Sequence, residues 1–415
     1  MLASWQHLAL SWDENGQKAL PLEGRAVILA KACLEANIAE AKMHTLLRVT
    51  MADRANLAFS LIGNPSLTVK HEEVKTILRL AFTALVAPEL TFFDALADGK
   101  FDLARPLLRI VVTCLKRFEK VKDRSSTLLL DIFEALVAKA GTSLFNRARV
   151  HPDEDVADMI SIIIAVGQEV VDLCSKDAII SEFCNKLMDH NSLDAAVRMY
   201  ATSHQALIDD QPIFAELSLL YMVTLAPAPR VPEQLAVARI LAYIMESPIS
   251  SILQSSDIRT PHSHVLHRVW TRGVLPVIFN LLQSLGSRIL HDTVAFLRLY
   301  EHQIQSAFTE WARPKVVTTT LADETALLLV LFEVVDSYLR MEQDQFVFNG
   351  KEDLLENVNN LLAHPRFLAR LVHPTSLEEE KLMEQRKEGE FRNGLVAKIA
   401  GDLEDMRGLL GVVEH

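Results

Sequence analysis

The chain has 415 residues, half of them apolar, and its formal net charge at pH 7 is −12. An acidic chain lacks the concentrated basic surface that displaces counterions from phosphates, so we expect no direct contact with nucleic acid. Its 14 Gly and 15 Pro are few for this length, which indicates long elements with short connections and favours helices. On length alone, the chain forms two or three ordinary domains or one elongated repeat structure.

The cysteines and the apolar runs indicate the compartment. Cys33, Cys114, Cys174 and Cys184 lie inside apolar runs, where a thiol behaves as core material, and their spacing fits neither a disulfide framework nor a zinc site. We therefore expect a reducing compartment, the cytosol or the nucleus. The N-terminal segment does not look like a signal peptide, and the strongest apolar runs are shorter than the roughly 18 residues of a membrane span. No transmembrane segment is expected.

Helical signals recur along the whole chain. Apolar residues are spaced at helical intervals within 74–85 and 129–140, which predicts helices that each pack one face. Helix starts are predicted near residues 22, 43, 66, 102, 125, 152, 177, 192, 210, 232, 261, 290, 320, 351 and 376. The fold class is therefore all-α, with about fifteen helices and no convincing strand.

Several of these helix ends rest on particular residues. The acidic segment 152–158 favours a first helical turn, so the β-branched run 160–167 is assigned to a buried helix and not to a strand. Residues 376–379 form a capping box. Gly99 and Gly350 are placed as helix stops.

The helix starts predict a repeat architecture. Successive pairs of helices occupy roughly the 40 to 47 residues of a HEAT or armadillo unit, although no consensus recurs at a fixed position. We expect one continuous α-solenoid over residues 1–415, an irregular HEAT/armadillo-like superhelix, with a possible bend near 226–232 and a C-terminal capping helix at 376–411. The segment 373–380 is the next break after 226–232.

Three histidines close together raise the possibility of a metal site. If Thr260 caps a helix, His262 and His264 are separated by about 200° around its axis, and His264 and His267 by about 60°. One metal ion cannot reach all three, and no HExxH motif supplies the usual geometry. We therefore predict that these side chains pack on the helix surface or between helices.

Other catalytic patterns are equally weak. The sequence lacks Gly-rich phosphate loops and a GxSxG nucleophile elbow, and residues 154–158 match the aspartate-rich motif of terpene synthases only loosely. No catalytic, cofactor-binding or metal-binding residue is predicted. An all-helical enzyme that uses Asp155, Asp158 or His264 is kept as an alternative.

Two segments are candidate interaction surfaces. Phe346 and Phe348 stand among polar residues at the end of a helix, either tucked under a loop or presented to a partner. The last helix carries a narrow apolar stripe, which is either its packing face or a surface for another helix. We name this set the C-terminal stripe: Phe391, Leu395, Ile399, Leu403, Met406 and Leu410.

Residues Leu46 to Ile62 ("LLRVTMADRANLAFSLI") and Ser126 to Ala148 ("STLLLDIFEALVAKAGTSLFNRA") resemble the C-terminal tail region of the large inner-ring scaffold nucleoporins. The resemblance covers most of the chain. It implies a superhelix like that of the nuclear transport receptors, and a chain that is one piece of a longer polypeptide. The family has no catalytic residues.

The resemblance also implies a function and its partners. The function is that of a non-enzymatic structural scaffold of the nuclear pore complex, at the nuclear envelope, that supports nucleocytoplasmic transport of protein and mRNA. The partners are other nucleoporins, chiefly short helical segments of linker nucleoporins. The alternative is a transport-receptor-like or adaptor solenoid that reversibly binds peptide motifs such as Phe-Gly repeats.

Overall fold

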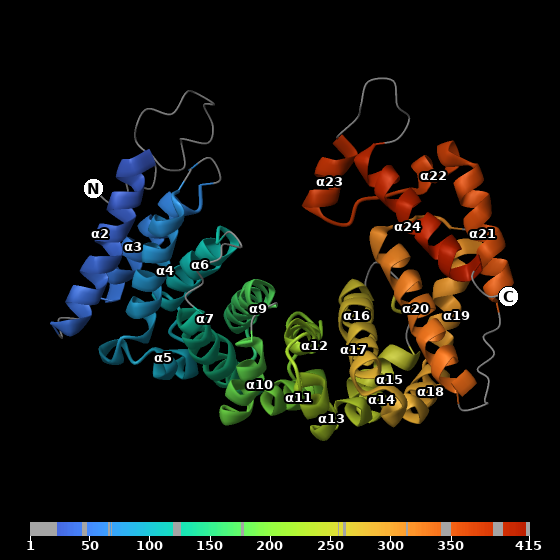
Figure 1. Ribbon diagram of the computed structural model, residues 1–415, viewed down its shortest axis with the longest axis horizontal. Coiled ribbons are helices and arrows are strands. Elements are labelled where there is room, and N and C mark those ends of the chain that lie inside the picture. The colour runs from blue at the N-terminus through green and yellow to red at the C-terminus, as the bar shows by residue number, and fades with distance from the viewer. Residues whose placement is uncertain are drawn as a thin grey trace. The chain divides into compact units, whose positions relative to one another are not determined.

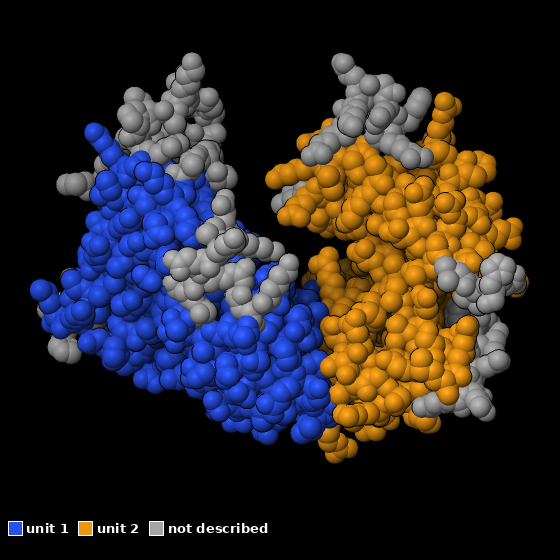
Figure 2. Space-filling model, in the orientation of Figure 1, with its two compact units in different colours: residues 1–238 blue, residues 239–415 orange. Residues whose placement is uncertain are grey.

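The computed structural model describes residues 23–43, 48–64, 67, 69–118, 126–175, 178–255, 257–259, 263–312, 314–341, 350–384 and 393–411. The chain divides into two compact units, residues 1–238 and 239–415 (Figure 2). Throughout the described residues the regular structure is helical (Figure 1), and two isolated β-bridges join described residues to each other, Ile208 with Gln211 and Val317 with Val372. The predicted all-α fold class is confirmed.

The first unit is an array of helix pairs. α2 pairs with α3, α4 with α6, α8 with α9 and α11 with α12, while α3, α6, α9 and α12 contact one another in succession. Its elements are α2 (Glu23–Lys42), α3 (Arg48–Ile62), α4 (His71–Val86), η1 (Pro88–Leu90), α5 (Phe92–Asp98), α6 (Ala104–Lys116), α7 (Ser126–Ile132), η2 (Phe133–Lys139), α8 (Ala140–Val150), α9 (Glu154–Cys174), α10 (Ile180–Asp189), α11 (Ser192–Thr202), η3 (Ser203–Gln205), α12 (Ile213–Leu225) and α13 (Val231–Val237).

α9 shows how the sequence specifies one of these helices. The Asp153 side chain accepts a hydrogen bond of 2.7 Å from the backbone N–H of Val156 and so caps the N-terminus. Glu154 and Asp155 follow in the first turn, where negative charge complements the helix dipole. The run 160–167 lies inside this helix, as the acidic segment before it predicts.

A π-helical segment, η2, joins α7 to α8 and contacts α12. The carbonyl oxygen of Val137 within η2 accepts a hydrogen bond of 2.9 Å from the Tyr221 hydroxyl. Gly141 allows this approach, because a Cβ atom there would lie 3.1 Å from the same hydroxyl oxygen. Tyr221 is buried, so its hydroxyl needs such a partner.

The second unit is organised around helix α20, which contacts α17, α18, α19 and α24. Its core holds Trp270, whose ring stacks on Tyr300 at a centroid distance of 5.0 Å. The elements are α14 (Ile240–Glu246), α15 (Pro248–Ser255), α16 (His264–Arg268), η5 (Val269–Val274), α17 (Leu275–Leu285), η6 (Gly286–Ile289), α18 (Leu290–Leu299), α19 (Glu301–Thr309), η7 (Glu310–Ala312), α20 (Thr319–Met341), α21 (Lys351–Ala363), α22 (Pro365–Leu371), α23 (Leu377–Glu384) and α24 (Gly394–Gly411).

Some element boundaries differ from the predicted ones. The expected single helix at 376–411 contains two helices, α23 and α24, because the Asn393 side chain caps a new helix by accepting from the N–H of Val396 at 2.9 Å. Gly350 directly precedes α21, with φ of 102°, and residues 342–349 before it lie outside the described residues. The capping box at 376–379 forms in part: the Ser376 hydroxyl accepts from the N–H of Glu379 at 3.3 Å, whereas the Glu379 carboxylate accepts from the N–H of Thr375.

The labelled helices outnumber the expected fifteen or so, because several are short or are parts of one continuous helix. The boundary between the two units, after Ala238, lies just beyond the segment 226–232 where a bend was expected. One continuous solenoid over 1–415 stays a prediction.

One continuous helical stretch of the described residues, His264–Leu299, has the length and apolar character that could cross a bilayer, with a mean hydropathy of 1.3. The bent pair His71–Val86 and Pro88–Asp98 would qualify as well if it were counted as one span. Half of the most apolar window of His264–Leu299 is buried inside the protein, and Trp270 in it is fully buried. Core helices have this character, so the stretch is no argument for a membrane segment.

Gly99 ends α5 in a conformation that another residue would strain. Its φ is 77°, and a Cβ atom would clash with the Arg147 guanidinium, which donates to the carbonyl of Ala97 at 2.6 Å. We expect Gly99→Ala to lower the free energy of unfolding by about 2 kcal/mol, through backbone strain and displacement of Arg147. Gly350→Ala is the comparison: φ is 102° and no atom lies within 4 Å of its Cβ position. Equal decreases in the unfolding temperature of the two variants would show that displacement of Arg147 adds nothing to the loss of stability.

Candidate interaction sites

The structure places two of the three clustered histidines. His264 is exposed at the start of α16, whereas the Nε2 atom of His267 lies 2.9 Å from a carboxylate oxygen of Glu324. His262 lies outside the described residues. Among the residues that the structure describes, no group of three or more His, Cys, Asp or Glu side chains is arranged to hold a metal ion. His267 therefore belongs to a polar cluster with Glu324.

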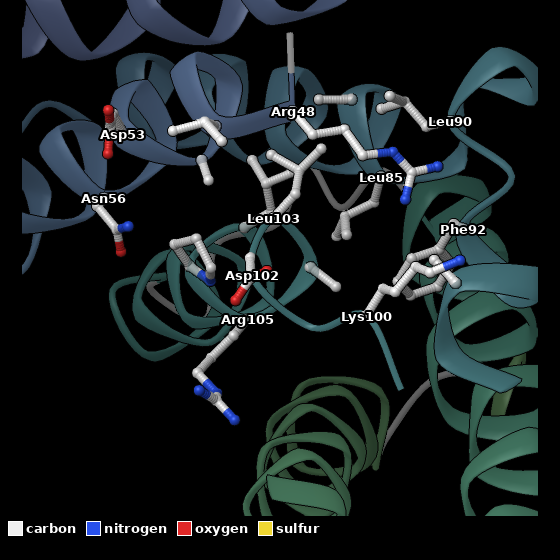
Figure 3. Close-up of a pocket in the computed structure, with 17 residues that line it drawn as sticks. Arg48, Asp53, Asn56, Leu85, Leu90, Phe92, Lys100, Asp102, Leu103 and Arg105 are labelled. Carbon is white, nitrogen blue, oxygen red and sulfur yellow. The ribbon is translucent and has the colours of Figure 1, made fainter. Parts of the chain in front are cut away.

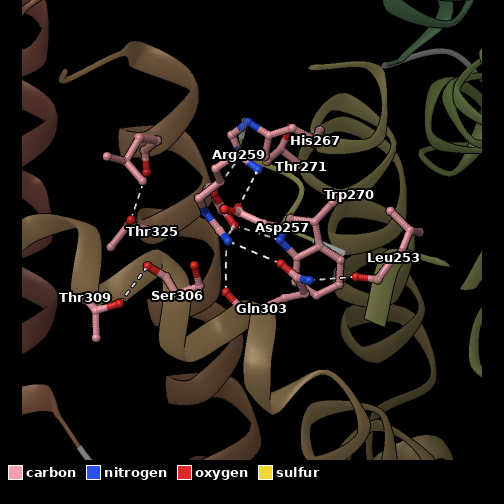
Figure 4. A network of polar contacts seen from close by, with 12 residues as sticks. Leu253, Asp257, Arg259, His267, Trp270, Thr271, Gln303, Ser306, Thr309 and Thr325 are labelled. Atoms are coloured by element: carbon pink, nitrogen blue, oxygen red, sulfur yellow. Dashed lines mark hydrogen bonds and ion pairs between the residues drawn. The ribbon is translucent and has the colours of Figure 1, made fainter. Parts of the chain in front are cut away.

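This Glu324 cluster consists of Glu324, Arg259, His267, Trp270 and Gln303; Figure 4 labels the last four. Glu324 projects from α20, is fully buried, and accepts hydrogen bonds from Arg259, from His267 and, at 2.8 Å, from the indole N–H of Trp270. Arg259 also donates to the backbone oxygen of Gln303 at 3.0 Å. Because each partner lies on a different segment, the cluster ties the segment before α16, α16 itself, η5 and α19 to α20.

The Gln303 side chain extends the cluster further. Its amide donates a hydrogen bond of 2.7 Å to the carbonyl of Leu253 at the end of α15. Gln303 is fully buried, so this bond satisfies a polar group that would otherwise be costly. The cluster therefore fixes the relative positions of five helical segments of the second unit.

Glu324 makes the stability of this unit depend on pH. Burial opposes ionisation of the carboxyl group, but the hydrogen bond from His267 and the charges of Arg259 and His267 outweigh it and hold the pKa of Glu324 below its usual value of 4.5. A folded-state pKa below the unfolded-state value contributes stability that is fully present above about pH 4.5 and is lost as the pH falls through the folded-state pKa.

We expect the difference in unfolding free energy between the natural chain and Glu324→Gln to shrink as the pH falls from about 4.5 toward 3, because Glu324 becomes protonated whereas glutamine does not titrate. Urea unfolding of both proteins at a series of pH values measures this difference. A difference that grows as the pH falls would contradict the lowered pKa of Glu324.

A cavity of the first unit lies between α3, α4, α5 and α6 (Figure 3). Its volume is 480 Å³, within the range of roughly 300 to 1,000 Å³ that is usual for binding pockets. Leu85, Leu90, Phe92 and Leu103 form an apolar floor. Its polar lining is charged and consists of Arg48, Lys100 and Arg105 together with Asp53, Asn56 and Asp102. We call this the α3–α6 cavity.

A shallower apolar notch lies farther along the same helices. Its volume is 300 Å³, and Phe59 of α3, Val112 of α6 and Ile162 and Ala165 of α9 line it. Arg109 borders it and lies 3.3 Å from the carboxylate of Asp158 on α9. Notches of this kind between adjacent helices can accept a side chain of a peptide.

Asp155 and Asp158, the carboxylates considered for an enzyme site, instead help to pack α6 on α9. The Nε atom of Arg105 lies 2.9 Å from Asp158, and Arg105 also pairs with Asp155 at 2.5 Å. These pairs are partly exposed, so each contributes about 0–1 kcal/mol to stability. His264 lies in the other unit.

The C-terminal stripe is covered by the chain itself. Leu395, Ile399, Leu403 and Met406 are fully buried, and α24 packs against α20, α21 and α23. The described members of the stripe thus form the packing face of α24. Phe391, Phe346 and Phe348 lie outside the described residues, so their use by a partner stays a prediction.

Together these features define a class of protein: an all-helical array of helix pairs with apolar surface cavities and with a polar cluster that serves packing. A family described as the "Nuclear pore protein NUP188 C-terminal domain" matches residues 77–410. The chain belongs to this family, and its predicted resemblance to the tail region of a large scaffold nucleoporin is confirmed.

Individual relatives agree with this assignment. The chain is 26% identical over 295 residues to "Nucleoporin nup184" of Schizosaccharomyces pombe, which covers 69% of this chain and 19% of that protein. It is 22% identical over 428 residues to "Nucleoporin NUP188" of Saccharomyces cerevisiae, and this match covers 92% of this chain and 26% of that protein. The chain thus spans about a fifth to a quarter of the length of these curated relatives.

A solved structure is similar in fold. It is a segment of Nup188 from Myceliophthora thermophila, with a TM-score of 0.69 and 21% sequence identity, over 81% of this chain and 98% of that one. At this identity the likeness shows the fold alone. It supports the helical-pair architecture.

Proposed function

We propose that this chain is a non-enzymatic structural part of the nuclear pore complex at the nuclear envelope. The observation that carries the proposal is the match of residues 77–410 to a nuclear pore protein family, on a chain with the fold of a Nup188 segment. The packing supports it: the buried Glu324 cluster and the paired charges of α6 and α9 hold neighbouring helices in fixed register, as a scaffold requires.

The partners we propose are other nucleoporins, bound through short helical segments of linker nucleoporins. Helix pairs leave grooves between neighbouring helices, and an amphipathic helix can lay its apolar face into such a groove. The α3–α6 cavity offers a floor of this kind. A second candidate function is reversible binding of Phe-Gly motifs, which the notch beside Phe59 and Val112 favours because it is apolar and shallow.

Purified components distinguish the two candidate functions. The chain is mixed either with a linker nucleoporin segment or with a Phe-Gly repeat segment, and each mixture is passed over a gel-filtration column. A stoichiometric complex with the linker segment alone supports the scaffold proposal. Binding to Phe-Gly repeats that is weak, salt-tolerant and sensitive to Val112→Asp supports the second function. Binding of neither removes both proposed sets of partners.

A further inference from the structure

The floor of the α3–α6 cavity is apolar, and its edge is open. The side chains of Leu85, Leu90 and Phe92 are 2%, 5% and 6% exposed, so they form a packed floor, whereas Val49 at the edge is 75% exposed. An exposed apolar side chain beside an apolar floor gives a bound partner additional apolar area to cover.

The charges around this floor are separated in space. Figure 3 shows Arg48 and Lys100 on the side of Leu90 and Phe92, and Asp53 and Asn56 at the opposite side. The cationic end carries an excess of positive charge. Asp98 is the carboxylate that Lys100 contacts there, at 2.7 Å.

The charges of several cations act on the Asp98 carboxylate. The hydrogen bond from Lys100 is the largest cause that lowers the pKa of Asp98, and the charge of Lys100 and the more distant charges of Arg147 and Arg48 lower it further. Arg48 and Lys100 line the cavity at this end, and an incoming carboxylate would find positive potential there.

The kind of ligand follows from the lining. The cations are on the surface, with the Lys100 side chain 61% exposed, so they can reach charges on a partner but do not form a buried cage for a small molecule. Asp53 and Asp102 in the lining oppose a nucleic-acid backbone. The helices α3 to α6 and the turn between α5 and α6 border the cavity, so a partner strand would find no sheet edge to extend, and an amphipathic helix fits best.

We infer that the α3–α6 cavity binds a short amphipathic helix of a partner protein, whose apolar side chains cover the floor and whose acidic side chains face Arg48 and Lys100. The inference rests on the proposed function in assuming that the chain binds helical segments, and it deepens that function by naming the site and the charge of the partner. Asp53 at the other end sets the direction of the bound helix, because it repels acidic and attracts basic side chains.

The test uses two synthetic peptides of about sixteen residues with identical apolar faces. In one peptide the charges at one end are acidic, and in the other the same positions are lysine. Fluorescence anisotropy measures their binding to the complete chain. We expect the acidic peptide to bind at least about tenfold more tightly, because like charges at Arg48 and Lys100 disfavour the basic one.

Variants connect this binding to the cavity. Arg48→Glu combined with Lys100→Glu should weaken the binding of the acidic peptide by about tenfold or more. Val49→Asp should weaken the binding of both peptides. The matched controls are Arg149→Glu and Val150→Asp on α8, because Arg149 is exposed, Val150 is 69% exposed, and neither lines the cavity. All of these substitutions are on the surface, and circular dichroism verifies that each variant is folded.

Three outcomes would overturn the inference. Binding of neither peptide at about 1 mM protein would show that the cavity takes no such helix. Equal affinity for both peptides, or affinity unchanged by Arg48→Glu with Lys100→Glu, would place binding elsewhere. Self-association that Val49→Asp abolishes would assign the cavity to a second copy of the chain. If the charge-reversed variant still forms a complex with a linker nucleoporin segment, the inference fails and the proposed function stands.

Discussion

Replacing Glu324 by alanine is expected to lower the free energy of unfolding of the second unit by about 3–5 kcal/mol. The carboxylate is fully buried, and its removal leaves the Arg259 guanidinium, which is 8% exposed, without its counter-charge. The indole N–H of Trp270 loses its acceptor in the same step. Breaking a buried pair by removing one member costs much more than a surface pair is worth, because the remaining charge stays desolvated.

Urea titration followed by tryptophan fluorescence measures this effect, since Trp270 and Trp311 are both buried in the second unit. The matched control is Glu333→Ala, an exposed glutamate on the same helix, which should change stability by no more than about 0.5 kcal/mol. A transition midpoint for Glu324→Ala that matches that of Glu333→Ala would show that the cluster does not stabilise the fold.

The second large effect concerns the C-terminal stripe. Leu403→Ala should lower the free energy of unfolding by about 2–5 kcal/mol, because this side chain is fully buried where α24 packs on its neighbours. The control is Met341→Ala at the end of α20, whose side chain is 79% exposed and should tolerate truncation. Thermal unfolding of the purified variants compares the two.

This prediction also separates the two interpretations of the stripe. If the stripe is a packing face, Leu403→Ala weakens the fold and affects partner binding only to the extent that the unit unfolds. A variant with unchanged thermal stability and lost partner binding would show instead that the stripe is a surface for a partner. The burial of Leu395, Ile399 and Leu403 favours the first result.

Local signals predicted the helical architecture well, because helix ends depend on neighbouring residues. The acidic segment at 152–158 correctly identified the start of α9, and Gly99 correctly marked the end of α5. Gly350 lies directly before α21, and a residue with φ of 102° serves equally well before a helix as after one. The extra helix in 376–411 follows from the Asn393 cap, a single side chain that an unbroken apolar pattern conceals.

The interaction sites were less predictable, because they assemble from distant segments. The angles around the helix argue that the three histidines do not share one ion, but they could not show that His267 meets Glu324, 57 residues away in sequence. One signal was available: Glu324 occupies a position on the apolar face of its helix, between Leu321 and Leu328, where a lone acid needs a buried partner. The α3–α6 cavity gave no sequence signal, since four helices contribute to it.

We propose that this chain is a structural part of the nuclear pore. Proximity labelling tests it most directly, with the labelling enzyme fused to the complete protein in living cells and a soluble nuclear protein as the reference. We expect inner-ring nucleoporins to be the most enriched proteins and the fusion to be concentrated at the nuclear rim. Enrichment of soluble cargo or of small GTPases, with no pore components and no rim signal, would contradict it.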